Sequence, residues 1–256
     1  MARSQVGPLI RDWRHRRHLS QLAVAVDVGV SARHLSFVET GRSRPSPELV
    51  LTIADHLDVP LRERNDLLLA AGYAPRYSRT PLDDDSMARV RASLQRMLDA
   101  HDPYPGVVID RCWNVVLANR AANVLVAVVP EHVRQPAMNV FRICLHPDGL
   151  AAQTVNFGEW AGYLLRQIRR TVVLTGDAEL AALEDEVLAY PNVAAVSRVA
   201  PDDQALLVPF VVDLGGRRLS MFTTLTTFGT PRDVTLEELS VELFYPADDD
   251  TEQALT

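Results

Sequence analysis

The spacing of apolar residues in the first 75 positions predicts five short helices. The periodic segments run over 9–18, 21–28, 32–40, 47–57 and 60–72. Ser20 and Ser31 stand at N-cap positions, and Gly29 and Gly41 follow the ends of the second and third segments. The pattern therefore indicates an all-α domain built from short, well-capped helices.

Two of these segments, 21–28 and 32–40, have the spacing of a helix-turn-helix. Their facing apolar stripes are formed by Val24, Ala25, Val28, Leu35 and Val38. This packing leaves an outward face on the later segment, formed by Ala32, Arg33, Ser36 and Phe37. In the major groove the guanidinium of Arg33 suits guanine O6 and N7, and the Phe37 ring suits a thymine methyl. We therefore predict that 32–40 is a DNA-recognition helix.

The stretch LSQLAVAVDVGVSARHLSFVETGRSRPS, residues 19–46, resembles the helix-turn-helix of the Cro/C1-type (XRE) family of phage and bacterial repressors. The matching positions are Ser20, Gln21, Ala25, Gly29, Ser31, Leu35, Glu39, Thr40, Gly41 and the basic loop that ends at Pro45. The resemblance covers about 60 residues, and it implies that this domain binds double-stranded DNA.

The resemblance also implies roles for individual side chains. It implies that Gln21 donates to a phosphate and that Arg14 pairs with Glu39 inside the domain. The full set of expected DNA contacts is Gln21, Ser31, Ala32, Arg33, Ser36, Phe37, Thr40, Arg42 and Arg44. Among these, Thr40, Arg42 and Arg44 are expected to hold the DNA backbone after the recognition helix.

The charge distribution favours contact with a polyanion at the amino-terminal end. All 26 basic residues are arginines, and the net charge is −7. Residues 1–46 hold eight arginines against three acids, whereas the rest of the chain holds 18 against 30. A basic segment on an acidic body suits a local DNA contact. A helical bundle with solvated arginines can also serve as a protein-binding module, and this alternative stays open.

Residues 76–104 have the pattern of a linker followed by a connecting helix. Pro75 and Pro81 interrupt the helical periodicity, and an acidic run at 83–85 precedes an amphipathic stretch over 87–101. Its apolar side is formed by Val90, Leu94, Met97 and Leu98. The sequence is compatible with either a connector or a dimerisation helix here.

The remaining residues, 105–256, alternate between strand and helix patterns. Strands are predicted over 106–110, 113–117, 205–213, 217–227 and 239–244, and helices over 119–129, 156–175 and 178–189. Gly215 and Gly216 fit a hairpin turn. In the segment 141–146 apolar residues alternate with polar ones, which suits a strand or an extended segment with one apolar face. We expect an α+β domain with an antiparallel sheet.

The order of these pieces resembles the MmyB-like transcriptional regulators of actinobacteria and related bacteria. The motifs that carry the likeness are LLLAAGYAP, TPLDD, PYPGVVIDRCWNVVLAN, NVFRICLHPDGL and FGTPRDVTLEELSVELFYPAD, and the resemblance extends from Leu9 to Asp248. It implies a DNA-binding domain over 1–75, a linker over 76–104 and a PAS-like ligand-binding domain over 105–256. It also implies that the ligand is a small apolar molecule similar to a fatty acid.

Apolar cavities with few polar anchors are the usual small-molecule sites, and the second domain offers candidate lining residues. They are Phe141, Arg142, Leu145, His146, Trp160, Leu164, Phe222 and Leu225. Arg142 or His146 would meet a carboxylate head group. The alternatives are that the aromatic residues belong to the core and that His146 stabilises the turn at 147–149.

Other classes of protein find little support in the sequence. The chain has two cysteines, Cys112 and Cys144, which we expect to be buried small hydrophobes, and no spacing typical of a metal site. Catalytic motifs are absent from the sequence, so we expect no enzyme activity, no catalytic residues, no metal and no cofactor. No apolar run could form a membrane span or a secretory signal, so we expect a cytoplasmic protein.

The combined reading is a homodimeric regulator that binds a pseudo-palindromic operator. A second reading keeps DNA binding but gives the carboxy-terminal domain only an oligomerisation or partner-protein role. The sequence leaves both readings open.

Overall fold

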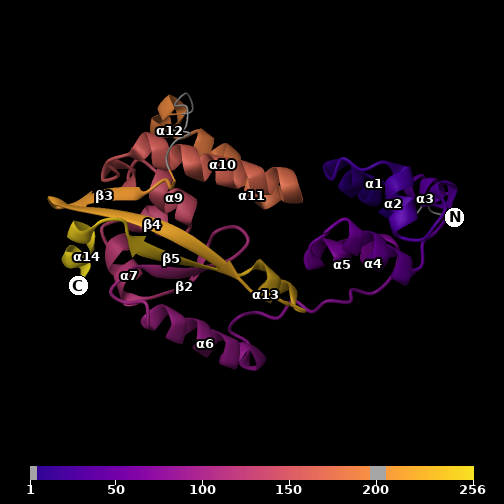
Figure 1. Ribbon diagram of the computed structural model, residues 1–256, viewed down its shortest axis with the longest axis horizontal. Coiled ribbons are helices and arrows are strands. Elements are labelled where there is room, and N and C mark those ends of the chain that lie inside the picture. The colour runs from indigo at the N-terminus through magenta and orange to yellow at the C-terminus, as the bar shows by residue number, and fades with distance from the viewer. Residues whose placement is uncertain (1–4, 197–205) are drawn as a thin grey trace. The chain divides into compact units, whose positions relative to one another are not determined.

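The computed structural model describes residues 5–196 and 206–256, which form two compact units (Figure 1). The helical unit consists of the described chain up to Thr80 together with Thr230–Glu237. The sheet unit consists of the other described residues, Pro81 to Gly229 and Glu238–Thr256. No helix in these described ranges is both long and apolar enough to cross a bilayer.

The amino-terminal part of the helical unit is a series of short helices, as the sequence predicts. They are α1 (Val6–Arg16), α2 (Gln21–Asp27), α3 (Ala32–Glu39), α4 (Pro47–His56) and α5 (Leu61–Ala70). The hydroxyls of Ser20, Ser31 and Ser46 each accept a hydrogen bond from a backbone N–H three residues later. The prediction of an all-α helix-turn-helix domain is therefore confirmed.

The core of this unit brings α1 close to the end of α3. Val24, Leu35 and Val38 are fully buried, as the apolar stripes predicted. Gly7 lies in the first turn of α1, where a Cβ would stand 2.5 Å from the carbonyl oxygens of both Val38 and Glu39. The lack of a side chain at Gly7 therefore permits the close approach of these two helices.

The sheet unit contains a five-stranded sheet in the order β2-β1-β5-β4-β3. The strands are β1 (Gly106–Ile109), β2 (Val115–Ala118), β3 (Phe210–Leu214), β4 (Arg217–Thr227) and β5 (Ser240–Pro246), and every neighbouring pair is antiparallel. With its helices, this sheet confirms the predicted α+β, PAS-like fold.

Helices pack on both faces of the sheet (Figure 1), and one of them lies on the face of Gly106 and Leu243. That helix is α6 (Ala88–Asp99), preceded by a 3-10 turn at Asp85–Met87, and its Leu98 is fully buried. The other helices of the unit are α7 (Arg120–Val126), α8 (Glu131–Arg134), α9 (Val140–Leu145), α10 (Phe157–Thr175), α11 (Ala178–Leu188), α12 (Pro191–Val196) and α14 (Asp249–Leu255), with a 3-10 turn at Leu150–Ala152. Figure 1 shows α6 and the pair α10 and α11 on opposite sides of the sheet. Leu94 and Leu98 of α6 are buried, whereas Met97 on the same apolar side is 40% exposed.

Most of the predicted strands and long helices are present. The turn at Gly215 and Gly216 joins β3 to β4, and both glycines have positive φ, as a two-residue hairpin turn requires. The strand predicted over 205–213 begins at Phe210, and residue 205 lies outside the described residues.

The strand or extended segment expected over 141–146 is wrong, because Val140–Leu145 form the helix α9 and His146 is its C-cap. Asn139 caps it by accepting hydrogen bonds from the backbone N–H groups of Phe141 and Arg142. The helix is short and almost wholly buried, so its apolar residues show no helical period. An alternation of apolar and polar residues is therefore no guide to the secondary structure of this segment.

Residues 230–237 connect β4 to β5 but pack in the helical unit. The buried carboxylate of Asp233 accepts hydrogen bonds from the hydroxyls of Ser78 and Thr80, at 2.9 and 2.7 Å. Glu237, in α13 (Val234–Glu238), accepts one from the Leu61 N–H at 2.6 Å. Since α5 has no cap from its own N-cap side chain, Glu237 supplies it.

We predict that Gly7→Ala destabilises the protein by about 1–3 kcal/mol, because the new methyl group overlaps two backbone carbonyls that have little room to move. Urea unfolding followed by circular dichroism measures this loss. Gly162→Ala in α10 is the control, since a Cβ there meets only the flexible end of Arg166, at 3.3 Å. Equal stability of the two variants would contradict the close α1–α3 contact.

Candidate DNA interface and ligand cavity

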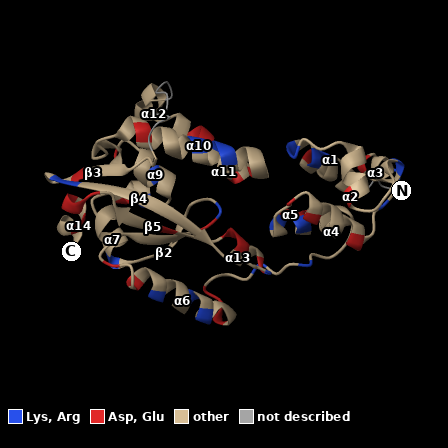
Figure 2. Ribbon diagram, viewed as in Figure 1, with Lys and Arg blue, Asp and Glu red and all other residues tan. Residues whose placement is uncertain are grey.

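The outward face of α3 carries the residues predicted to read DNA. Gly29, with φ of +73°, forms the turn between α2 and α3, and the side chain of Ser31 caps α3. Leu35 and Val38 are buried, while Arg33 is exposed and Ser36 and Phe37 are partly exposed. Figure 2 shows basic residues at α1 and beside α3.

Phe37 lies beneath two arginines. The guanidinium carbon of Arg33 is 5.3 Å from the centre of its ring, and that of Arg42 is 5.8 Å away. Both distances are within the range of cation–π attraction. The ring thus holds one arginine from the recognition helix and one from the following loop on the same surface.

Three of the other predicted DNA contacts are engaged inside the protein. Gln21 donates to Glu39 at 2.7 Å, and the Thr40 hydroxyl donates to the Ser36 carbonyl at 2.7 Å. Arg44 donates to the carbonyls of Ala71 and Gly72 and lies over the Tyr73 ring. The predicted face of Ala32, Arg33, Ser36, Phe37 and Arg42 stays available on the surface.

A buried ion pair holds α3 against α1. Arg14 Nε and Nη2 donate to the two oxygens of Glu39 at 2.7 and 2.9 Å, as the sequence predicted. Burial acts to raise the pKa of Glu39, but the hydrogen bonds from Arg14 and Gln21 outweigh it and lower that pKa. The carboxylate therefore stays ionised at neutral pH, and the position of α3 depends on it.

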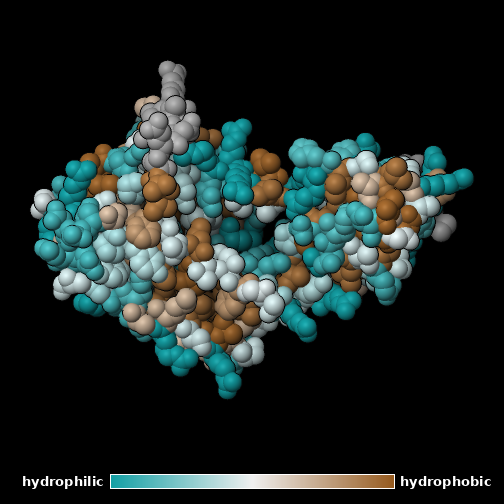
Figure 3. Space-filling model, viewed as in Figure 1, coloured by the Kyte–Doolittle hydropathy of each residue, from teal (hydrophilic) through white to brown (hydrophobic). Residues whose placement is uncertain are grey.

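Exposed apolar side chains are present on both units, as the brown areas of Figure 3 show. On α2, Leu22 and Val26 are 64% and 67% exposed, and they stand one helical turn apart. The packing of α2 on α3 does not use them, and their spacing resembles that of buried positions in a helix. The sequence pattern therefore did not single them out as surface residues.

The sheet unit contains a partly open apolar cavity of about 50 Å³ between its sheet and the covering helices. Its wall includes Val107, Val115, Met138, Ile143, Phe210 and Phe244, which come from strands β1, β2, β3 and β5 and from α9 and the segment before it. A cavity of this size has room for one or two water molecules, whereas an apolar cavity that binds benzene measures about 150 Å³.

Glu242 is the acidic residue in this apolar wall. It lies on β5 opposite Val107 of β1, is 3% exposed, and its Oε2 has no hydrogen-bond partner. Burial raises the pKa of Glu242 to about 7, and a hydrogen bond with Thr223 offsets only part of the effect. The cavity thus holds a carboxyl group whose protonated form is favoured by burial, compared with an exposed glutamate.

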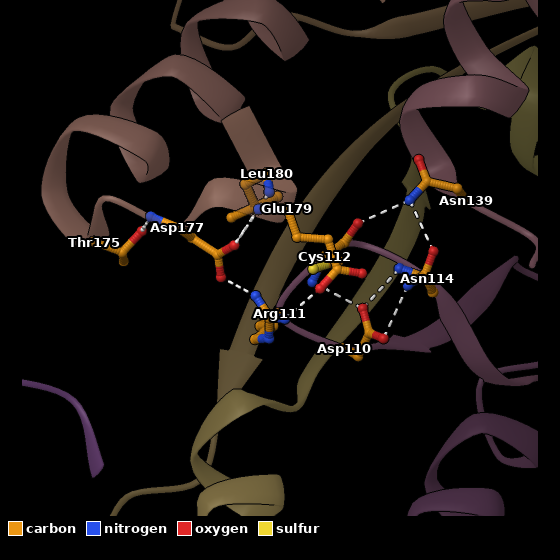
Figure 4. A network of polar contacts seen from close by, with 9 residues as sticks. All are labelled: Asp110, Arg111, Cys112, Asn114, Asn139, Thr175, Asp177, Glu179 and Leu180. Atoms are coloured by element: carbon orange, nitrogen blue, oxygen red, sulfur yellow. Dashed lines mark hydrogen bonds and ion pairs between the residues drawn. The ribbon is translucent and has the colours of Figure 1, made fainter. Parts of the chain in front are cut away.

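One wall of the cavity is fixed by a polar network around the β1–β2 turn (Figure 4). Asp110 accepts hydrogen bonds from the N–H groups of Cys112 and Asn114, and Asn139 donates to the Cys112 carbonyl at 2.8 Å. Arg111 forms ion pairs with Asp177 and Glu179 at the start of α11. The turn is therefore fastened to the segments that begin α9 and α11.

None of the eight residues predicted to line a ligand site is among the residues that line the apolar cavity. Phe141, Leu145, Trp160 and Leu164 are fully buried in the core of the unit but do not line the cavity. Phe222 stacks on Tyr245, which neighbours Phe244 in β5. Because neighbouring residues of a strand point to opposite faces, Phe222 lies on the face of the sheet opposite to Phe244. Leu225 is 40% exposed. Their role in ligand binding stays a prediction.

The two remaining members, Arg142 and His146, line a separate surface hollow with Glu186 and Tyr190. Arg142 donates to both oxygens of Glu186, at 2.8 and 2.7 Å, and this ion pair lowers the pKa of Glu186. His146 Nδ1 accepts from the N–H of Asp148, which agrees with the alternative that His146 stabilises the turn. The structure does not bring these residues to the apolar cavity.

In the described ranges, two groups of side chains have the spacing of metal ligands. Ligand atoms of His132, His146 and Asp148 lie within 4.8 Å of one another, but His132 and Asp148 already form a hydrogen bond. In the second group, of Cys112, Asp177 and Glu179, both acids pair with Arg111. These contacts account for both groups without an ion, and the expectation of no metal stays a prediction.

Both cysteines are buried, as the sequence predicted. Burial raises the pKa of Cys112 to about 11 and that of Cys144 to about 12. Both thiols are therefore protonated at neutral pH. Cys144 lines the cavity as a small apolar residue.

A helix-turn-helix with an arginine-bearing recognition face, joined to a sheet domain that contains an apolar cavity, defines a DNA-binding regulator with a ligand-binding domain. The chain belongs to the MmyB-like transcription regulators, since the ligand-binding domain of that family matches residues 90–256. A helix-turn-helix domain family matches residues 5–67. Both are families of regulatory domains and neither is enzymatic.

More distant comparisons add no functional argument. No curated protein matches the chain. Among solved structures, an RNA-binding light-oxygen-voltage receptor is similar at 12% sequence identity and a TM-score of 0.30. The similarity covers 99% of this chain, which spans 61% of the length of that receptor.

We predict that Glu39→Gln destabilises the protein by about 3–5 kcal/mol at neutral pH, because it leaves the buried Arg14 charge without its anion. The folded-state pKa of Glu39 is below its unfolded value, about 4.3. Its stabilisation is therefore present above that pH and is lost as the pH falls through the folded-state pKa.

Urea unfolding at a series of pH values measures this difference. The stabilities of the natural protein and Glu39→Gln should converge below about pH 4. Asp66→Asn, at an exposed position of α5, is the control and should show only a small effect. A constant gap between the natural protein and Glu39→Gln down to pH 3 would rule out the ion pair as its cause.

Proposed function

We propose that this regulator uses α3 as its recognition helix and binds a pseudo-palindromic operator as a homodimer. The observation that carries the proposal is the surface on which Arg33, Phe37 and Arg42 lie together. Arg33 reads a guanine, and Arg42 contacts a phosphate. Two such helices in a dimer would enter successive major grooves at half-sites about 34 Å apart.

The apolar wall of the cavity supports a small apolar ligand, similar to a fatty acid. The cavity of about 50 Å³ is too small for an acyl chain, so ligand entry requires the wall to open. A ligand that binds the opened arrangement better than the closed one shifts the population between them. This requirement links ligand binding to a conformational change.

The connection between β4 and β5 offers a route from that change to the DNA-binding helices. Asp233 fixes the connection to Ser78 and Thr80, and Glu237 caps α5. Burial acts to raise the pKa of Asp233, but its hydrogen bonds from Thr80 and Ser78 outweigh it and lower that pKa. We propose that strands β4 and β5 transmit the state of the cavity through this segment.

Native mass spectrometry of the purified protein distinguishes this proposal from a purely oligomeric role of the sheet unit. A retained adduct of acyl size supports a sensor. A dimer that binds operator without an adduct, and without any response to added fatty acids, supports the oligomerisation role instead.

We predict that Arg33→Ala loses about 1–3 kcal/mol of operator binding and relaxes the preference at one base position. Arg42→Ala should weaken binding to all sequences alike and reduce the dependence of affinity on salt. Sequencing of DNA recovered with the protein supplies the operator, and titrations with operator and scrambled duplexes measure both effects.

Arg169→Ala is the matched control, because it removes the same charge from an exposed position of α10 in the sheet unit. It should leave operator affinity within about twofold. If Arg33→Ala bound both duplexes as the natural protein does, α3 would not be the recognition helix.

We predict that Asp233→Asn abolishes most of the ligand effect on operator affinity while both binding activities remain. The amide keeps one acceptor oxygen, so it cannot accept both the hydrogen bonds that Ser78 and Thr80 donate to Oδ2 and the one that the Thr235 N–H donates to Oδ1. Couplings between sites are typically about 5–150-fold. Operator titration with and without dodecanoic acid at pH 6 measures the coupling.

Asp213→Asn is the control for this variant. Asp213 accepts a hydrogen bond from Gly216 in the β3–β4 turn, within the sheet unit. It should keep the full ligand effect. An undiminished ligand effect in Asp233→Asn would show that the β4–β5 connection does not carry the signal.

A further inference from the structure

The side chain of Glu242 is an exception to the usual treatment of buried charge. It stands in the middle of β5, next to Val107 of β1 and Leu225 of β4 in the strand register. It is 3% exposed, and its Oε2 makes no hydrogen bond. A buried polar atom without a hydrogen-bond partner normally costs stability. The position of this oxygen on a cavity wall therefore points to a ligand group that forms the missing hydrogen bond.

The surroundings of Glu242 offer little to stabilise a negative charge. Thr223 of β4 is its hydrogen-bonding neighbour, and Thr223 also hydrogen bonds with Tyr163 of α10. Cys144 of α9 is the further titratable group that feels its charge. Burial raises the pKa of both Tyr163 and Cys144, so both stay protonated between pH 6 and pH 8. In this pH range Glu242 is therefore the group at the cavity that titrates.

We propose that Glu242 is the polar anchor of the cavity and that it admits apolar ligands whose head group is uncharged and forms hydrogen bonds. A carboxylic acid ligand would then bind only if either its own carboxyl group or that of Glu242 is protonated. Two ionised carboxylates in contact would repel each other. This inference rests on the proposed ligand-binding role of the cavity and specifies the chemistry of its ligand.

The alternatives within the unit fit an acyl head group less well. Arg142, the arginine predicted to meet a carboxylate, already pairs with Glu186 in the surface hollow. Asn123, the amide in the cavity wall, donates to the Asn119 carbonyl of its own helix. Glu242 is left as the wall residue with an unused polar atom.

Isothermal titration calorimetry of the full chain with decanol and with decanoic acid, at pH 6 and pH 8, tests the proposal. Decanol should bind with similar affinity at both pH values, since a hydroxyl both donates and accepts hydrogen bonds. The affinity for decanoic acid should fall by about tenfold or more between pH 6 and pH 8. At pH 8, buffers with different ionisation enthalpies should report the uptake of about one proton.

Glu242→Gln should lose the pH dependence for decanoic acid, because an amide does not ionise. Glu186→Gln makes the same change in the surface hollow and should keep that dependence. Proton uptake is measured on the natural protein, so the test holds even if Glu242→Gln fails to fold.

The outcomes separate two failures. If neither probe binds the natural protein, the cavity is not a ligand site, and both the proposed function and this inference fall. If both probes bind but decanoic acid shows no pH dependence and no proton uptake, the cavity binds ligands and only the role of Glu242 is wrong. Retention of the pH dependence in Glu242→Gln would also overturn that role.

Discussion

The carboxylate of Asp233 ties the strand connection of the sheet to the unit that carries the recognition helix. It accepts hydrogen bonds from Ser78 and Thr80 on one side and from the Thr235 N–H at the start of α13 on the other. Because this segment lies between β4 and β5, two central strands are covalently continuous with residues packed on the helical unit. The proposed coupling would therefore act through this segment, which also caps α5 through Glu237.

Three buried carboxyl groups have different roles because their surroundings differ. Glu39 has a bidentate arginine, and Asp233 has hydroxyl and N–H donors, so both remain ionised and fix the structure. Glu242 has a single hydroxyl neighbour, and burial dominates its titration. A buried carboxyl group whose oxygens all accept hydrogen bonds within the folded chain stabilises that chain. A buried carboxyl group with an oxygen that has no hydrogen-bond donor is available to a ligand. The difference lies in the donors around each group, and it separates structural acids from a candidate binding residue.

Local pattern was sufficient for the helical unit, because Ser20, Ser31 and Gly29 mark boundaries by interactions within a few residues. It was insufficient for the cavity, whose residues come from four strands and several short helices. A Glu between Val241 and Leu243 resembles the solvent side of an amphipathic strand, but helices cover both faces of this sheet and bury Glu242. Burial is also the reason why the sequence did not predict α9, since a helix that is buried on nearly every side shows no helical period of apolar residues. The return of residues 230–237 to the helical unit depends on contacts more than 150 positions apart, which spacing does not encode.

The small volume of the cavity has a consequence for the affinity and the response of the regulator. For the proposed acyl ligand, which about 50 Å³ cannot hold, the binding-competent arrangement would be a less populated one, and the free energy of opening would reduce the apparent affinity. The β1–β2 side of the wall is held by Asp110, Asn139 and the ion pairs of Arg111, whereas α7 and α8 are helices of seven and four residues. Opening should therefore displace α7 and α8 first, and β5, which carries Glu242, should follow only when a head group engages that carboxyl. An apolar molecule without such a group would fill the cavity yet leave the strands, and hence the DNA-binding unit, largely as they were.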